Sequence, residues 1–431
     1  MYKIFLIFFV TVLFTACSTM QQQAPASNKK VFAQEDAYIM FALRAEQVKS
    51  YKTAAELFEK LYQKSQKEEY LIRSLENRYL AKDYEDVVTL VNKYLEETLK
   101  DKRQLLRYKI ASLAELQKIP EAKSLALALA KKTQKSEDYI LTADVYIKNH
   151  EYEDALKYLE SAYAKEYDEK ILDKMAIILY INLSRKKDAI AELETHTRVH
   201  GCSELICNRL IGIYSNENNI EGLLSVYKRK YALTKDSEIA KKIIQIYGYN
   251  RDYIKLMNFL EESGEDDALL LQLYLSARDF QKAFILADKL YKNDGSLEYL
   301  GQSAIYEYEA NKKDLNKKVL DSVIDKLTKV VKQNSDSLYK NYLGYILIDH
   351  EIDVKLGMKY IKEVLKVKPD SGYYLDSLAW GYYKLGQCKK AKKLMLKVKK
   401  LEGGDDPEVD MHMKKINQCL KNKIQRGKSN K

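Results

Sequence analysis

The stretch NYLGYILIDHEIDVKLGMKYIKEVLKVKPDSGYYLDSLAWGYYKLGQCKKAKKLMLKVKKL spans Asn341 to Leu401 and contains one pattern twice. Each copy has an apolar helical period, a short break and a second apolar helical period, which predicts two antiparallel helices. The pattern recurs after about 34 residues, and that period is typical of helical units that stack into a solenoid. The stretch therefore predicts an all-α repeat fold.

The second copy places small and large side chains at fixed intervals. In order they are Leu378, Ala379, Tyr382, Gly386, Ala391, Met395 and Val398. Two antiparallel helices approach closely only where the facing side chains are small, and bulky side chains fill the space beside them. Gly386 falls in the turn, where a helix end often requires a positive φ. The spacing resembles that of the tetratricopeptide repeat (TPR).

The first copy has the same order, with Leu343 and Gly344 on its first helix, Gly357 and Ile361 on its second, and Pro369 just past the end. Proline at that position stops the helix. One extra residue lies between the two glycines, so we expect a longer turn. Over about sixty residues, the tandem pair resembles the C-terminal units of bacterial TPR lipoproteins. Lipoproteins of that layout act in the assembly of envelope machinery.

The chain begins with a leader. Residues 1–16 contain one cation, Lys3, and an apolar core of signal-peptide length that is too short to span a bilayer. The letters LFTAC, which end at Cys17, resemble a lipobox, and this implies a lipidated thiol. Phe14 departs from the Leu, Val or Ile that is usual there. Ser18, rather than Asp, implies the outer membrane facing the periplasm. The alternative is an ordinary secretory signal with a coincidental cysteine.

The remaining chain divides by composition. Residues 18–30 are polar, and a lipidated cysteine with a flexible tether is expected over 17–34. Divergent TPR-like repeats are expected over 35–333 and two well-formed units over 334–402. A capping helix is expected over 403–420 and a basic tail over 421–431. The sequence thus predicts an all-α, right-handed α-solenoid of about ten or eleven TPR-like helix–turn–helix units with a C-terminal capping helix. The apolar face of that helix contains Val409, Met413, Ile416 and Leu420.

Two upstream units are phased by small and large residues at the same intervals. The first is marked by Ala42, Ala54, Phe58 and Leu61. The clearest is marked by Tyr139, Ala143, Tyr146, Tyr152, Ala155, Leu159 and Ala162. We expect these side chains to lie in the core between paired helices.

The composition of the 431-residue chain is that of a helical protein, with only 15 Gly and 4 Pro. Its 35 tyrosines indicate core positions and groove walls rather than a cofactor box. The formal net charge is +11, and the lysines are spread among glutamates rather than gathered in one stripe. This distribution argues against a nucleic-acid partner and favours acidic proteins or lipid headgroups.

Motifs for enzyme chemistry are missing from the sequence. There is no Gly-rich phosphate loop, no Gly-x-Ser-x-Gly and no Cys-x-x-Cys. His196 and His200 lie four residues apart, but polar residues near a helix end explain them better than a metal pair. We therefore expect no catalytic residues, no metal, no cofactor and no small-molecule substrate. An enzyme built from scattered residues in the groove is one alternative, and a purely structural spacer is the other.

Four cysteines remain beyond the leader, and an even number in an oxidising compartment suggests pairing. Cys202 and Cys207 can bond only if Cys202 lies before the helix that holds Cys207. A bond between Cys388 and Cys419 would fix the capping helix to the last repeat. Four buried free thiols are the alternative.

A solenoid of helix pairs presents a concave surface lined by the first helix of each unit, and such surfaces bind extended or helical peptides. Aromatic side chains with neighbouring Asn and Asp suit this role, because they offer large contact areas and peptide hydrogen bonds. The sequence therefore predicts a non-enzymatic scaffold that binds other envelope proteins. The candidate groove residues are Asn341, Tyr345, Asp376, Trp380 and Tyr383.

Overall fold

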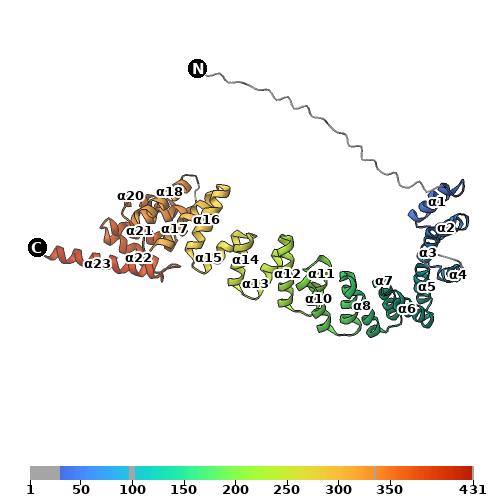
Figure 1. The fold of residues 1–431 in the computed structure, drawn as a ribbon. Helices are drawn as coiled ribbons and strands as arrows, with labels where there is room; N and C mark the ends of the chain where they lie inside the picture. Colours follow the sequence, from blue (N-terminus) through green and yellow to red (C-terminus); the bar gives the residue numbers. More distant parts are fainter. Residues whose placement is uncertain (1–29, 97–101, 334–335, 430–431) are drawn as a thin grey trace, which may run out of the picture. The chain divides into compact units, whose positions relative to one another are not determined.

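The structure is a computed structural model that describes residues 30–96, 102–333 and 336–429, with side chains to residue 422. Every regular element in these ranges is helical (Figure 1). The chain divides into two compact units, unit 1 up to Leu233 and unit 2 from Thr234. Cys17 and the leader lie outside the described residues. None of the described helices combines the length and the apolar character that a membrane span requires.

Unit 1 contains twelve α-helices and one π-helical turn, with α12 ending at the unit boundary. They are α1 (Glu35–Gln47), α2 (Tyr51–Ser65), α3 (Glu68–Leu80), α4 (Tyr84–Leu95), α5 (Arg103–Glu115), α6 (Ile119–Thr133), α7 (Ser136–Lys148), α8 (Tyr152–Glu166), α9 (Glu169–Ile177), η1 (Ile178–Asn182), α10 (Lys186–His200), α11 (Glu204–Asn216) and α12 (Ile220–Thr234).

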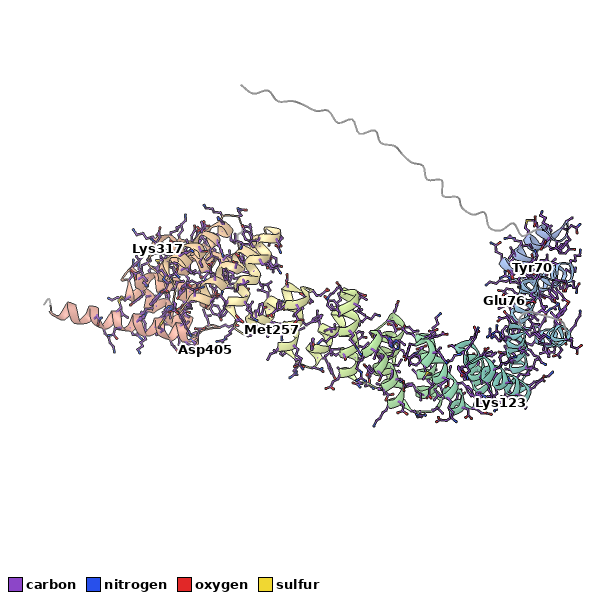
Figure 2. The ribbon with its side chains drawn as sticks, in the orientation of Figure 1. Tyr70, Glu76, Lys123, Met257, Lys317 and Asp405 are labelled. Atoms are coloured by element: carbon purple, nitrogen blue, oxygen red, sulfur yellow. A yellow bond between two sulfur atoms is a disulfide. The ribbon has the colours of Figure 1, made fainter. Side chains whose placement is uncertain are left out.

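Unit 2 contains the remaining helices. Lys317 opens α18, and Asp405 lies in the turn before α23 (Figure 2). The helices are α13 (Ser237–Tyr249), α14 (Tyr253–Ser263), α15 (Asp267–Ser276), α16 (Phe280–Asp294), α17 (Leu297–Asn311), α18 (Lys317–Gln333), α19 (Ser337–Asp349), α20 (Val354–Val367), α21 (Gly372–Lys384), α22 (Cys388–Val398) and α23 (Pro407–Ser429).

Within the described ranges, α1 to α22 pair in order into eleven helix–turn–helix units, which confirms the predicted repeat fold. The residues that phase the repeats lie in the core. Ala42, Ala54 and Leu61 have no exposed surface, and neither do Ala143 and Ala155. Small side chains at these positions let paired helices approach, and neighbouring large side chains fill the remaining space.

The closest helix contact in the two C-terminal repeats lies between α19 and α20. A Cβ atom added to Gly357 would lie 2.5 Å from the carbonyl oxygen of Gly344, and one added to Gly344 would lie 2.9 Å from the carbonyl oxygen of Gly357. Neither helix could keep this separation with a larger residue. Gly386 has φ +68°, as expected for the turn between α21 and α22.

The capping helix packs on the last repeat. Val409 and Ile416 of α23 are buried against Met395 and Val398 of α22. A disulfide joins Cys388 at the start of α22 to Cys419 of α23, as the sequence suggested. The helix continues to Ser429 instead of ending at residue 420. The expected tail is therefore largely part of α23, since its Lys, Gln and Arg residues favour a helix.

Trp380 does not line an open groove, so the prediction for this residue is wrong, and Tyr383 lines a separate shallow pocket beside α23. Trp380 is only 2% exposed, and the ring of His412 from α23 stacks on it with 3.9 Å between ring centroids. The indole N–H donates a hydrogen bond to Asp349 Oδ1 at 2.8 Å. Tyr383 stacks on the same indole at 4.6 Å. Trp380 is covered because α23 packs on α21, whereas Tyr383 stays half-buried.

Trp380→Ala should lower the free energy of unfolding by about 3–5 kcal/mol, because it leaves a large cavity beneath α23 and removes the hydrogen bond to Asp349. Urea unfolding followed by far-ultraviolet circular dichroism measures this change. The control is Leu396→Ala, which truncates an apolar side chain that is 52% exposed on α22. Equal midpoints for both variants would contradict a core role for Trp380.

Candidate functional site

A groove of about 540 Å³ lies in unit 2, and we name it the unit 2 groove. Its floor and sides come from the first helices of three successive pairs, α17, α19 and α21, together with the start of α23. Since the first helix of each TPR unit faces the concave side of an array, the groove lies where repeat proteins hold their ligands.

One face of α19 forms the floor of the groove. Leu338, Asn341, Tyr342 and Tyr345 line it, and their spacing of three and four residues places them on the same side of the helix. The opposite side of α19 carries Leu343 and Leu347, which are buried in the core of the unit. This division gives α19 a packing face and a groove face.

Tyrosines dominate the lining of the groove. They come from three different helices, so their aromatic faces surround the space from several directions. They are Tyr308 of α17, Tyr342 and Tyr345 of α19, and Tyr373 and Tyr374 of α21. Tyrosine combines a large apolar ring with a polar hydroxyl, and this suits a surface that must bind yet stay partly wet. Of these five, Tyr373 is the most open, at 59% exposed.

The start of α23 closes one side of the groove. Tyr345 donates a hydrogen bond from its hydroxyl to Glu408 in the first turn of α23. One turn later, His412 Nδ1 lies 2.9 Å from Asp376 Oδ2. His412 has no exposed surface, so α23 is held against α21 by a buried polar contact as well as by apolar packing. The capping helix therefore shapes the groove as well as closing the array.

Charged groups gather at the α17 side of the groove. Lys312 Nζ lies 3.6 Å from Glu408 Oε2 and 4.0 Å from Glu309 Oε2, so one ammonium group forms ion pairs with two carboxylates. Burial raises the pKa of the Glu309 carboxyl, Lys312 opposes this rise, and the charge of Glu408 adds to it. The charged form of Glu309 is therefore unfavourable in this setting.

The hydroxyls of the groove tyrosines are also desolvated. Burial, with the charges of Glu309 and Glu408, raises the pKa of Tyr342 to about 12. Burial also raises the pKa of Tyr345, and nearby carboxylates add to that effect. These hydroxyls stay neutral at physiological pH, so they serve as hydrogen-bonding groups rather than as bases.

Three of the five groove residues named from the sequence line the unit 2 groove: Asn341, Tyr345 and Asp376. The sequence missed Tyr342, although it follows Leu338 by four residues on the same helix face. It also missed Glu309, Lys312 and Glu408. Glu309 and Lys312 lie in the divergent repeats, upstream of the two well-formed units. The position of Glu408 depends on how α23 packs on α21.

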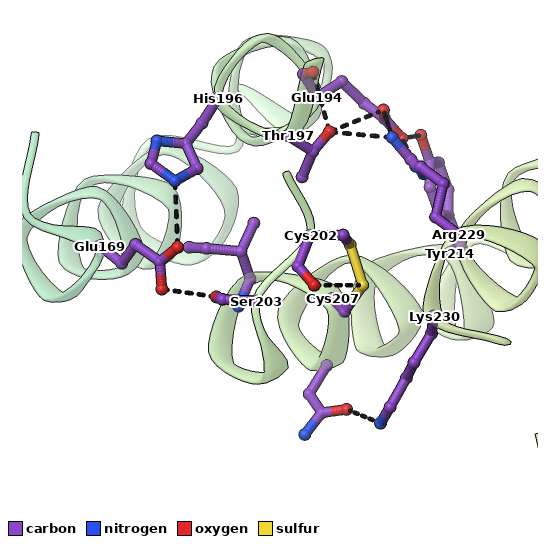
Figure 3. Close-up of a disulfide and its surroundings, with 12 residues drawn as sticks. Glu169, Glu194, His196, Thr197, Cys202, Ser203, Cys207, Tyr214, Arg229 and Lys230 are labelled. Atoms are coloured by element: carbon purple, nitrogen blue, oxygen red, sulfur yellow. Dashed lines mark hydrogen bonds and ion pairs between the residues drawn. A yellow bond between two sulfur atoms is a disulfide. The ribbon is translucent and has the colours of Figure 1, made fainter. Parts of the chain in front are cut away.

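The four cysteines beyond the leader form two disulfides. Cys202 lies before α11 and bonds to Cys207 on that helix (Figure 3). Cys388 and Cys419 form the second bond. The bond at Cys202 fixes the loop between α10 and α11 to the start of α11.

The histidine pair of α10 is structural. His196 is 4% exposed, and its ring nitrogens lie 2.6 Å from the Tyr163 hydroxyl and 3.2 Å from Glu169 Oε1 (Figure 3). Glu169 in turn accepts a hydrogen bond from Ser203. Both ring nitrogens therefore have partners. Within the described ranges, no group of three or more His, Cys, Asp or Glu side chains is arranged to hold a metal ion.

Unit 1 has a groove of its own, which we name the unit 1 groove, of about 450 Å³ between α9, η1 and α11. Its lining is mostly aliphatic and includes Ile177, Ile181, Leu205 and Ile213. The π-helical turn η1 displaces Ile181 outward, where it is 65% exposed. Turns of this kind are frequent at functional sites.

The family comparison covers only part of the chain. The sequence model of the ChAPs family, described as Chs5p-Arf1p-binding proteins, matches residues 3–199. The match spans less than half of the chain and none of the unit 2 groove. Comparison with curated protein sequences gave no significant match.

The chain is also similar to solved structures. One is the APC/C hetero-tetramer Cut9-Hcn1, at 11% identity and a TM-score of 0.37, covering 90% of this chain and 97% of the matched chain. Another is Naa15/Naa10 bound to HypK-THB, at 13% identity and a TM-score of 0.28, covering 88% of this chain and 65% of the matched chain. Its own paired helices and buried small residues make this chain a TPR-like helical repeat protein.

Glu309→Gln should stabilise unit 2 at neutral pH. Because burial raises the pKa of Glu309 in the folded state, the native chain loses stability as pH rises above about 4.3, the value of an unfolded glutamate. The neutral amide of glutamine does not ionise, so the variant does not lose this stability as the pH rises. We expect the melting temperature to match the wild type near pH 4 and to exceed it at pH 7.5.

The matched control is Glu262→Gln, which neutralises an exposed carboxylate on α14. It should leave the melting temperature unchanged at both pH values. If Glu309→Gln melts below the wild type at pH 7.5, then the ionised carboxylate stabilises the fold, and the interpretation of its environment is wrong.

Proposed function

We propose that this chain is a non-enzymatic protein-interaction scaffold and that its unit 2 groove binds an extended segment of a partner protein. The supporting observation is the groove itself. Five tyrosines and four carboxylates line about 540 Å³ across three successive repeats. A groove of this length and composition suits a peptide, whose side chains fill aromatic pockets while its amides pair with polar groups.

The histidines of unit 2 support a binding role over a catalytic one. His350 Nε2 lies 3.1 Å from the Tyr308 hydroxyl, and His412 is held by Asp376 beneath α23. His412 has no exposed surface, so a ligand in the groove does not reach its ring. Catalytic turnover by the purified protein would favour the alternative of an enzyme.

We further propose that the chain is anchored in the cell envelope through a lipid on Cys17, in the outer membrane facing the periplasm. The lipobox-like letters before Cys17 support this proposal. The two disulfides support it independently, because disulfides persist mainly in oxidising compartments such as the periplasm. The polar residues 18–30 would then separate the repeats from the lipid surface, since Phe32 already packs on the first repeat.

A second candidate function rests on the match over residues 3–199. The name of that family states that its members bind Chs5p and Arf1p, so unit 1 could be the part that holds a protein partner here. The aliphatic unit 1 groove, with Ile181 exposed, is the surface for this candidate. The first candidate predicts that partner capture depends on Tyr373 in unit 2, and the second predicts that it depends on Ile181 in unit 1.

Cys17→Ser should release the protein from the membrane fraction or leave its leader uncleaved, because the thioether to diacylglycerol cannot form. Stable anchoring depends on the acyl chains, each methylene of which contributes roughly 0.8 kcal/mol. Fractionation and acyl labelling in cells measure the change. Membrane attachment and labelling that survive the substitution would contradict anchoring at this residue.

Tyr373→Ala should reduce capture of the partner about tenfold or more, because aromatic residues in a groove usually carry much of the binding free energy. Crosslinked pull-down from native membranes, with the partner quantified by mass spectrometry, measures capture. The control is Tyr253→Ala, which removes a tyrosine of similar exposure, 51%, from α14. Both variants should keep the wild-type melting temperature.

Ile181→Asp distinguishes the second candidate. Loss of capture in this variant, with full capture by Tyr373→Ala, would move the binding site to unit 1 and contradict the proposal for unit 2. Equal capture by all variants would place the partner on neither groove.

A further inference from the structure

The unit 2 groove contains more hydrogen-bond acceptors than donors. Its carboxylates belong to Glu309, Asp376, Asp406 and Glu408, and its cations are Lys312 and Lys368. The formal charge of the lining is therefore negative although the whole chain carries +11. A local field of this sign, opposite to that of the chain, favours a cationic ligand.

Two of the tyrosine hydroxyls that line the groove already have partners within the protein. Tyr345 donates its hydroxyl hydrogen to Glu408, and the Tyr308 hydroxyl pairs with His350 Nε2. Asn341 presents a buried Oδ1 atom that has no hydrogen-bond partner among the described residues. A buried acceptor without a donor costs free energy, so a ligand that brings N–H groups would gain most at this position.

Lys312 is the cation nearest to the paired carboxylates, and it is held loosely. Its ammonium lies 4.0 Å from Glu309 and 3.6 Å from Glu408, and its side chain is 44% exposed. The Glu309 side chain is only 23% exposed. A lysine with this exposure can move into solvent at little cost. Glu309 is more buried than Lys312, and Glu408 is held by the hydroxyl of Tyr345.

Aromatic rings lie beside the same carboxylates. Tyr308 and Tyr342 are both close enough to Glu408 for its charge to raise the pKa of their hydroxyls. A cation over the face of a tyrosine is attracted by the ring, and the attraction is stronger where water is excluded. Carboxylates and rings together make a site with selectivity for organic cations.

We propose that the unit 2 groove binds an arginine or lysine side chain of the partner's extended segment, between Glu309 and Glu408 and against the ring of Tyr342. Lys312 occupies this position in the free protein, and the incoming cation displaces it. This inference rests on the proposed function of the groove and specifies the chemistry of its ligand. Arginine is the better fit, because its planar guanidinium can pair with carboxylates and stack on rings at once.

The direct test uses two dye-labelled peptides and the full chain. One is Gly-Ser-Tyr-Arg-Gly-Arg-Tyr-Ser-Gly with blocked ends, and its twin has citrulline, the neutral isostere, in place of both arginines. Fluorescence anisotropy should show at least tenfold tighter binding of the arginine peptide, because only that peptide can pair with the carboxylates. Equal affinities for the two peptides would overturn the inference.

Two pairs of variants locate the contact. Glu309→Gln should abolish the preference for arginine over citrulline, while Glu262→Gln keeps it. Lys312→Met should tighten binding of the arginine peptide about threefold, since it removes the resident cation. Lys368→Met makes the same change in net charge on the same groove, and it should increase the affinity for the arginine peptide by a smaller factor. A preference that survives in Glu309→Gln would contradict the proposed contact.

The outcomes separate this inference from the proposed function. If both peptides bind equally and both are lost in Tyr373→Ala, then the groove binds peptides without a cation site, and only the inference falls. The same holds if neither peptide binds but capture of the partner still depends on Tyr373. If capture does not depend on Tyr373, the proposed function falls, whatever the peptides do.

Discussion

The packing of α23 on α21 and α22 is the contact on which the C-terminal half of the structure depends. Each helix pair of a repeat array covers an apolar face of the pair before it, so the last pair needs a different cover. Here Val409 and Ile416 fill that face, His412 stacks on Trp380, and the disulfide to Cys388 fixes the helix in place. Without this helix, the indole and the core beneath it would face water.

The same helix gives the unit 2 groove its chemistry. Its first turn brings Glu408 to within reach of Tyr345 and Lys312, on the side where Glu309 is already partly buried. Two carboxylates thus share one exposed lysine in a setting that opposes the ionisation of one of them. Perturbed carboxylates cluster at functional sites, so in the proposed binding role stability and binding would place opposite demands on Glu309.

Much of the fold was predictable because it depends on local spacing. Small residues such as Ala143 and Gly357 recur at the intervals where paired helices touch, and Gly386 marks a turn that needs a positive φ. The apolar face of α23 was equally predictable, since Val409 and Ile416 lie seven residues, or two helical turns, apart. These features need only the geometry of a single helix pair or a single helix.

By itself, the sequence determined the repeat, the helix pairs, the cap and three members of the groove, Asn341, Tyr345 and Asp376. Only the tertiary structure decided that Trp380 is core and that Glu309, Lys312 and Glu408 meet. Helical period tells which residues share a face, but it does not tell what covers that face. The path of α23 across α21 supplies the cover, and that path depends on packing between segments distant in the chain.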